Sequence, residues 1–379
     1  MREGWEYKKL GQVCTSDLGK TLNKSKDRGE LHPYLCSINI LWDKIDLSTL
    51  KQACFEAGEQ EKYTVRKGDL LVCEGGDTGR SAIWDRDETI LYQNALHRLR
   101  FHESVFPKFV LFYLMYLKDI GEIDNKYSKG VTIKHLVKKA LLSIPLPLPP
   151  KPTQLSIVSE LDKLNELIRI KKEQLKDYDA LAQSIFYEMF GDPVVNEKGW
   201  EMISLSELSM YPNERIAINQ LSPSQYVGVE NLIKDRGGVR FSNSLPKANS
   251  AIAYKENDIL LGNIRPYLKK IWLADKGGGA SGDVVIIRIS NRKITPVFLF
   301  KVLSSDSFFE YDNTYTKGAK MPRGDRKAIA KFGVILPPLP LQQSFAHKIE
   351  QIERQKASVQ KTISDLEMLL AARMQHWFD

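Results

Sequence analysis

Two long segments of the chain carry apolar residues at alternating spacings of four and three positions. The first lies in residues 153–190 and the second in residues 341–379. Such a seam, sustained over roughly five heptads, is typical of a coiled coil and not of an ordinary surface helix. The predicted seam consists of Ile157, Leu161, Leu164, Ile168, Leu175 and Ile185 in the first segment and of Phe345, Ile349, Ile352, Val359, Ile363 and Leu370 in the second.

Each seam also contains a lysine, Lys171 in the first segment and Lys356 in the second. A polar residue at such a position more often fixes the register of the helices than carries a function. The simplest partner for one helix is the other. We expect an antiparallel pair, because a parallel pair would crowd both globular parts at one end.

The segments before the two predicted helices have a different pattern, in which short apolar runs alternate with glycine-rich turns. Runs such as residues 69–73, 95–101 and 283–289 predict β-strands. One longer apolar segment in each part, at residues 107–121 and 296–305, begins with a proline and predicts a helix that packs on a sheet. The expected fold is α+β (mixed α/β), with a globular β-rich domain followed by a long helix.

Proline-rich stretches at residues 144–152 and 335–341 connect each globular part to its long helix. Proline lacks an N–H and disrupts a helix interior, so these stretches predict the exit from each domain. A polyproline ligand for an SH3-like partner is the alternative. The recurrence of the stretch at the same place in both halves argues against it.

The two halves share short matches that occur in the same order. Gly-Trp-Glu at residues 4–6 returns at 199–201, and NKYSKG at 125–130 returns as NTYTKG at 313–318. Chance similarity does not preserve order, so we infer a tandem duplication of about 190 residues. The predicted parts are a first domain (1–152), a central helix (153–190), a second domain (191–340) and a C-terminal helix (341–379).

Composition and charge narrow the class of protein. A formal net charge of +8 favours a polyanionic partner without establishing one. No run of about eighteen apolar residues predicts a membrane span, and the first residues lack the apolar core of a signal peptide. The four cysteines are widely spaced and form no CxxC pair, which argues against a zinc site or a disulfide scaffold and predicts a reducing cytoplasm.

Catalytic motifs that an enzyme would need are missing. The run EGGDTGRS resembles a phosphate-binding loop, but Glu74 replaces its first glycine and Arg80 its lysine. An amino-methyltransferase would need an acidic or amide residue before a Pro-Pro pair, and Leu148 and Leu336 occupy those positions. The sequence contains neither a Pro-Asp nuclease motif nor an HExxH metal motif. We therefore expect a protein that binds and does not catalyse.

The order of domain, helix, domain and helix resembles the DNA specificity subunit of type I restriction-modification systems, over essentially the whole chain. The residues that carry the resemblance are Gly-Asp-Leu-Leu at 68–71, NIRPYLKKIW at 263–272, Gln154 and Gln342 after the proline-rich stretches, and MFGDPVVNEKGW at 189–200. No single one of these motifs is specific, whereas their common order is.

The resemblance implies that each globular part is a target recognition domain that reads one half of a bipartite site in double-stranded DNA. It also implies that the helices hold two modification (methyltransferase) subunits, and that separate restriction/translocase subunits complete the complex. S-adenosylmethionine and ATP would then bind to the partner subunits, and this chain would need no cofactor. The alternative is a protein–protein scaffold, with two β-rich binding domains on a coiled coil.

Candidate DNA-binding residues are the basic side chains of turn-rich places, because phosphates attract Lys and Arg and base edges favour Arg, Asn and Gln. Lys129 and Lys317 stand at equivalent places of the repeat beside Gly130 and Gly318, which predicts contacts with phosphates. Arg265 is predicted to discriminate bases. The full set is Arg80, Lys129, Lys134, Lys138 and Lys139 in the first domain and Arg265, Lys269, Lys270, Lys317, Lys320, Arg323 and Arg326 in the second.

Overall fold

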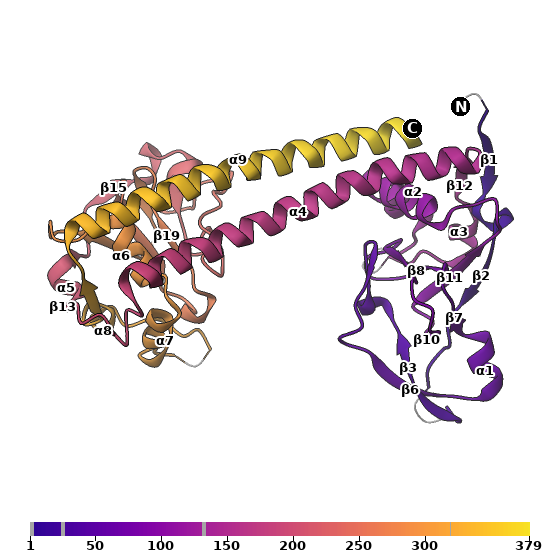
Figure 1. The fold of residues 1–379 in the computed structure, drawn as a ribbon, viewed down its shortest axis with the longest axis horizontal. Coiled ribbons are helices and arrows are strands. Elements are labelled where there is room, and N and C mark those ends of the chain that lie inside the picture. Colours follow the sequence, from indigo (N-terminus) through magenta and orange to yellow (C-terminus); the bar gives the residue numbers. More distant parts are fainter. Residues whose placement is uncertain (1–3, 24–26, 131–133, 319) are drawn as a thin grey trace. The chain divides into compact units, whose positions relative to one another are not determined.

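The computed structural model describes residues 4–23, 27–130, 134–318 and 320–379, which form two compact units (Figure 1). Unit 1 comprises Met1–Glu173 and Gln360–Asp379, and unit 2 comprises Gln174–Val359. Each unit therefore contains one globular domain together with part of each long helix.

The globular part of unit 1 contains two four-stranded sheets. The first has the order β2-β11-β8-β9 and is antiparallel throughout, with β2 (Cys14–Leu18), β11 (Leu96–Phe101), β8 (Leu70–Cys73) and β9 (Ser81–Ile83). The second has the order β6-β3-β10-β7, with β6 (Lys51–Phe55), β3 (Glu30–Leu35), β10 (Ile90–Tyr92) and β7 (Thr64–Val65). Two ribbons pair β1 (Glu6–Lys9) with β12 (Pro145–Leu148) and β4 (Ile40–Leu41) with β5 (Lys44–Ile45).

The helix α2 (Pro107–Asp119) forms the centre of the main core of unit 1. Proline at its first position supplies a pre-set helical φ and has no N–H to leave unpaired. Apolar side chains of α2 are buried together with those of the first sheet and the long helices. The shorter helical elements are η1 (Leu10–Gln12), η2 (Ser37–Asn39), α1 (Ala57–Lys62), the π-helical turn η3 (Ile123–Tyr127) and α3 (Lys138–Ser143).

Unit 2 repeats this plan. Its first sheet, β14-β21-β18-β19, consists of β14 (Ser209–Met210), β21 (Val284–Ile289), β18 (Ile259–Gly262) and β19 (Ile271–Leu273). Its second, β15-β17-β20-β16, consists of β15 (Arg215–Ala217), β17 (Ser250–Tyr254), β20 (Gly278–Ala280) and β16 (Tyr226–Val227), and β13 (Glu201–Ser204) pairs with β22 (Gly333–Leu336). The helical elements are α5 (Leu205–Leu208), η4 (Ile218–Gln220), η5 (Pro223–Gln225), η6 (Pro266–Leu268), α6 (Pro296–Leu303), α7 (Asp306–Thr314) and α8 (Arg326–Ala330).

The second sheets of the two units agree in their inner strands and differ at one edge. The strand β10 lies between β3, which is parallel to it, and the antiparallel β7; β20 lies in the same way between β16 and β17. The outer strand β6 pairs with β3 in unit 1, whereas β15 pairs with β17 in unit 2. The duplication predicted from the sequence is thus present in the fold, and the fold class is confirmed.

An ion pair between a buried aspartate and a partly exposed arginine occurs at the same place in both units. Asp69, which is 1% exposed, accepts hydrogen bonds from Nε and one terminal nitrogen of Arg100 at 2.8 and 2.7 Å. Asp258 accepts from the same atoms of Arg288 at 3.0 and 2.8 Å. The hydrogen bonds that the two arginines donate to these carboxylates hold the pKa of Arg100 and of Arg288 above the usual value. Each pair therefore connects the residue just before β8 or β18 to the adjacent strand, β11 or β21.

Gln154 and Gln342 fasten each long helix to its domain. Both side chains are fully buried. The oxygen of Gln154 accepts from the backbone N–H of Phe106 at 2.8 Å, and its nitrogen donates to the carbonyls of Ser104 and Pro149. Gln342 binds the backbone of Thr295, Lys293 and Pro337 in the same way. Each glutamine thus pairs backbone groups of the loop before α2 or α6 and one carbonyl of the proline-rich stretch, which would otherwise be left without these partners.

The long helices are α4 (Lys151–Phe190) and α9 (Leu339–Phe378), which begin two residues before the positions expected from the sequence. In unit 1, Glu160 of α4 accepts from Arg373 of α9, and Lys172 lies 2.7 Å from Glu367. In unit 2, Asp179 lies 2.7 Å from the seam residue Lys356. The residue numbers in α9 decrease as those of their partners in α4 increase. The two helices therefore pair in antiparallel fashion within each unit.

The seam side chains line the contact between the helices. Ile157, Leu161, Ile168, Phe345, Ile352, Val359 and Ile363 are buried, and Leu164, Leu175, Ile185, Ile349 and Leu370 are half-buried. Additional buried residues lie beside the heptad positions: Val158, Phe186, Phe190, Met374 and Phe378.

The far end of each long helix closes the core of the other repeat's domain. The ring of Phe378, at the end of α9, lies 5.4 Å from those of Phe109 and Tyr113 in α2. In unit 2, Phe190 at the end of α4 lies 4.8 Å from Phe298 in α6 and 5.3 Å from Phe345. Each globular core is therefore complete only with two helix segments that come from different repeats.

Two neighbouring glutamines test the role of the buried one. Gln342→Met should lower the free energy of unfolding by about 2 to 4 kcal/mol, because it leaves backbone groups of Thr295, Lys293 and Pro337 without this partner. Gln343 is exposed, and Gln343→Met should change the free energy of unfolding by less than about 0.5 kcal/mol. Urea denaturation of the two variants measures the difference, and equal effects would contradict the fastening role.

Candidate nucleic-acid interface

The repeated Tyr-x-Lys-Gly motif opens a small bridged structure in each unit. In unit 1, η3 ends at Tyr127, and Lys129 and His135 exchange two backbone hydrogen bonds of 3.0 and 2.8 Å. In unit 2, Lys317 and Arg323 exchange two bonds of 2.9 Å. Gly130 and Gly318 follow the lysines with φ of 119° and 95°, a region that favours glycine. We call these two residue pairs the bridged pairs.

A second segment lies against each bridged pair. It follows the central strand of the first sheet, as residues 74–80 after β8 and residues 263–270 after β18. Gly75 forms an antiparallel bridge with His135, and Ile264 forms one with Arg323. These strand-end segments differ in sequence between the two repeats, with GGDTGRSA at residues 75–82 and NIRPYLKK at residues 263–270. The structure thus brings the differing segments next to the shared lysines.

The predicted DNA-binding residues of unit 1 are not equally available. Arg80 donates to the carbonyl of Ser37 at 2.9 Å, and Lys134 donates to the carbonyl of Asp124 at 2.9 Å. Lys138 lies 4.0 Å from Asp17. Lys129 and Lys139 are exposed. Since Arg80 and Lys134 already bind protein oxygens, the exposed lysines are the better candidates for phosphate contacts.

In unit 2 several of the predicted residues have protein partners. The hydrogen bonds from Lys269 and Arg236 lower the pKa of Asp306 to about 2. Lys270 donates to the carbonyl of Val229, and Arg326 to that of Gly282. Lys317 is 80% exposed while it pairs with Asp325 at 2.6 Å, and Arg323 lies 3.1 Å from Asp283. Arg265 and Lys320 are exposed.

Sequence reasoning missed His135, which is the structural counterpart of Arg323. The repeat register was the available signal, because both residues stand five positions after the glycine of the motif. A histidine opposite an arginine does not look like a repeat match when the sequences are compared letter by letter. The backbone bridges make the equivalence visible.

One aspartate of the repeat has opposite environments in the two units. Burial raises the pKa of Asp124, but the hydrogen bonds from Lys118 at 3.0 Å and Thr78 at 2.8 Å outweigh it, so the net pKa lies below the usual value. Asp312, its counterpart, is 1% exposed, and burial raises its pKa to about 6. Within the described residues, neither carboxyl oxygen of Asp312 has a hydrogen-bond partner.

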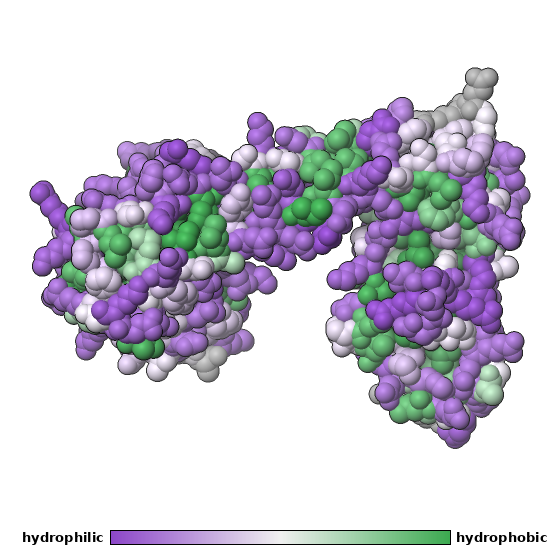
Figure 2. Space-filling view, viewed as in Figure 1, coloured by the Kyte–Doolittle hydropathy of each residue, from purple (hydrophilic) through white to green (hydrophobic). Residues whose placement is uncertain are grey.

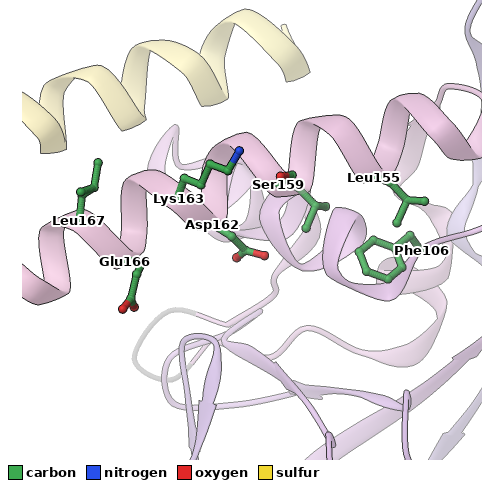
Figure 3. A pocket seen from close by; sticks show the side chains of 8 residues that line it. Phe106, Leu155, Ser159, Asp162, Lys163, Glu166 and Leu167 are labelled. Carbon is green, nitrogen blue, oxygen red and sulfur yellow. The ribbon is translucent and has the colours of Figure 1, made fainter.

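An open groove lies beside α4 in unit 1, with a volume of about 720 Å³ (Figure 3). Phe106 and Leu155 lie next to each other at one end of it, and Asp162 and Glu166 extend from the same side of the helix. Leu155, Leu167 and the nearby Ile170 are each 44 to 45% exposed. Apolar patches are visible along the helices in the space-filling view (Figure 2).

The repeat does not conserve this groove. At the positions of α9 that correspond to Leu155, Leu167 and Ile170, unit 2 has Gln343, Gln355 and Ser358. A groove in unit 2 is instead lined by α4 and α9 together and includes the charged side chains Lys348 and Arg354. The apolar groove is therefore a feature of unit 1 and not of the shared framework.

Two further observations concern the parts of the chain that the structure describes. They contain no helix that is long and apolar enough to cross a membrane. They also contain no group of three His, Cys, Asp or Glu side chains that could hold a metal ion.

Comparisons with known proteins show what this chain is similar to. Residues 2–177 match the family described as the type I restriction modification DNA specificity domain. The specificity subunit of the type I restriction enzyme EcoDI from Escherichia coli is 20% identical, over 72% of this chain and 69% of the relative. The MjaIX specificity subunit from Methanocaldococcus jannaschii is 25% identical, over 96% and 90% of the two chains.

Solved structures share the fold over the full length. The S subunit of a type I restriction-modification system from M. genitalium has a TM-score of 0.52 at 14% identity, with 99% of this chain and 96% of that chain covered. A chain from a study of complex assembly and conformational transition of the type I R-M system has a TM-score of 0.60 at 17% identity, with coverage of 100% and 98%.

Residues 2–177 are thus similar to the type I restriction modification DNA specificity domain. The chain as a whole is similar to the specificity subunits of type I restriction enzymes, and the resemblance seen in the sequence is confirmed. These relatives are specificity subunits, which agrees with the expectation that this chain is not a catalytic one.

The contrast between Asp312 and Asp124 generates a prediction on pH dependence. The pKa of Asp312 is about 6 in the folded state and 3.8 ordinarily, so the folded state binds the proton more tightly. Its contribution to the free energy of unfolding is complete at low pH, falls by about 3 kcal/mol as pH rises from about 4 to about 6, and then stays constant. Asp312→Asn should remove this decline, as measured by urea denaturation across that range.

The control for this prediction is Asp124→Asn, which removes a group whose pKa is shifted in the opposite direction. It should take away stability that is present above the ordinary pKa and lost as pH falls. If both variants changed the pH profile in the same direction, the assignment of Asp312 as a buried acid would be wrong.

Proposed function

We propose that this chain is the DNA-binding specificity subunit of a type I restriction-modification complex. Each unit reads one half of a bipartite target in double-stranded DNA, and the chain performs no catalysis of its own. The observation that carries the proposal is the bridged pair, which occurs twice with an exposed lysine, a glycine of positive φ and a variable strand-end segment beside it. The specificity domain family and the relatives' names support it.

The chemistry of the bridged pairs fits DNA. An exposed lysine next to a glycine lets a phosphate approach the backbone closely, and phosphate contacts position a protein without selecting sequence. The strand-end segments differ between the units, and they supply the side chains that would select different half-sites. Lys317 currently neutralises Asp325, so a bound phosphate would exchange places with that carboxylate.

The helices would hold the partner subunits. The apolar groove at Phe106, Leu155 and Leu167 in unit 1 fits one modification (methyltransferase) subunit, because exposed apolar side chains on a helix gain from burial in an interface. A relative in a type I complex supports assembly of this kind. S-adenosylmethionine and ATP would bind to the modification and restriction/translocase subunits.

The cellular compartment follows from the same proposal. The four cysteines, Cys14, Cys36, Cys54 and Cys73, form no disulfide. A chain with unpaired thiols that acts on cellular DNA would work in the cytoplasm of its cell.

The phosphate role is tested by salt dependence. Lys129→Ala and Lys317→Ala should each weaken binding to every duplex and lower the slope of log affinity against log salt by about one. Lys361→Ala, on the exposed side of α9, serves as the control and should leave the slope unchanged. Filter binding over a salt series measures it. If the affinity of the wild-type chain for DNA did not depend on the salt concentration, the alternative function as a protein–protein scaffold would be favoured.

The docking role is tested at the groove. Leu155→Ser together with Leu167→Ser should reduce co-purification with the modification subunit at least tenfold, because the partner would meet polar side chains in place of apolar ones. Leu31→Ser changes a leucine on β3 that is 61% exposed, more than Leu155 or Leu167, and should have no effect. Retained assembly in the double variant would show that the groove is not the docking site.

A further inference from the structure

The two bridged pairs present different side chains on the same backbone. In unit 1 the residue bridged to both Lys129 and Gly75 is His135; in unit 2 the residue bridged to both Lys317 and Ile264 is Arg323. The residue that follows is fixed in the same way, since Leu136 donates to the carbonyl of Glu74 at 2.7 Å and Gly324 to that of Asn263 at 3.1 Å. The histidine and the arginine therefore occupy one and the same place in the repeat.

In unit 1 both backbone hydrogen-bonding groups of His135 already have partners in the bridge. Its N–H and carbonyl bond to Lys129, so the exposed imidazole is the part that remains available to a ligand. The ring lies over Gly75, where an added Cβ would come within 3.3 Å of Cε1 and Nδ1. The missing side chain of Gly75 thus makes room for this orientation of the ring.

In unit 2 the guanidinium of Arg323 is oriented by a carboxylate. One terminal nitrogen lies 3.1 Å from Oδ1 of Asp283, and the side chain remains 52% exposed. Asp283 and Ala95 hold equivalent places, since their carbonyls accept from Asn263 and Glu74 respectively. The carboxylate is therefore present in the unit that has the arginine, and an alanine replaces it in the unit that has the histidine.

We propose that His135 and Arg323 are base-reading residues, one in each half-site, while the neighbouring Lys129 and Lys317 contact phosphates. This inference rests on the proposed function and deepens it. Arg323, held by Asp283, presents a planar fork that matches the O6 and N7 acceptors of guanine in the major groove. The neutral imidazole of His135 has one N–H donor, so it makes a single hydrogen bond to a base acceptor. It therefore does not match the paired O6 and N7 acceptors of guanine as the arginine fork does.

The placement explains why the same framework can serve two half-sites. A base-reading side chain must be held firmly, because a hydrogen-bond pattern selects a base only when its donors are fixed. Each of these residues lies between two backbone bridges and next to a phosphate-binding lysine. Exchange of one side chain changes the base that is read without any change in the backbone.

The test is an exchange of side chains in the full-length chain assembled with its modification subunits. Arg323→His and His135→Arg are each used to select duplexes from a randomised pool, and the selected sequences give the base preference at every position. Arg323→His should reduce the preference for guanine at one position of one half-site roughly tenfold or more, with the other half-site unchanged. His135→Arg should create a guanine preference in the opposite half-site.

Two further variants separate base reading from charge. Arg323→Lys keeps the charge but loses the fork, so it should retain the salt dependence and lose the guanine preference. Arg292→His changes another exposed arginine of unit 2 and should alter neither the salt dependence of binding nor the guanine preference. Thermal melting of each variant confirms that the fold is intact.

The outcomes distinguish the inference from the proposed function. If Arg323→His and Arg323→Lys keep every base preference while a bipartite target persists, the inference is overturned and the proposed function stands. Uniform weakening on all sequences with a lower salt slope would make Arg323 a phosphate contact and also overturn it. A wild-type complex without any sequence preference would overturn both.

Discussion

Burial of the aromatic helix ends holds this protein together. The apolar faces of α2 and α6 are covered only when Phe378 and Phe190 arrive from the far ends of α9 and α4. Since apolar burial contributes about 25 cal/mol per Å², a large aromatic side chain at such a place contributes on the order of several kcal/mol. Each domain therefore depends on a helix segment from the other repeat, and the antiparallel pairing follows from that dependence as well as from the heptad seam.

Repeated polar contacts convert this packing into a rigid frame. Gln154 and Gln342 connect the start of each long helix to the backbone before α2 and α6, and the pairs Asp69–Arg100 and Asp258–Arg288 hold the residue before β8 and β18. That strand leads directly into the strand-end segment, which is bridged to the lysine motif. The frame is therefore repeated in the two units, while the side chains of the strand-end segments differ between them.

The net charge of +8 overstates the basic surface that is available to a polyanion. Arg80, Lys134, Lys270 and Arg326 donate to backbone carbonyls, and Lys269 neutralises Asp306. Lys129 and Lys317 stand out because they are exposed and the frame holds their backbone, although Lys317 also pairs with Asp325 at 2.6 Å. The units also differ away from these lysines: the apolar groove beside α4 in unit 1 has polar residues at the matching positions of α9, so the two repeats offer different surfaces to a partner.

The sequence by itself determined the duplication, the proline-rich stretches, the long helices and the α+β class. Periodicity depends on neighbouring residues, and the order of repeated motifs can be read along the chain without knowledge of spatial contacts. It also indicated the lysines of the repeated motif. Only the tertiary structure decided which basic side chains bind protein oxygens, that His135 corresponds to Arg323, and that Asp312 is buried without the partners of Asp124. The helix ends Phe190 and Phe378 became core residues for the same reason: these roles depend on contacts between residues far apart in the chain, and no local pattern records them.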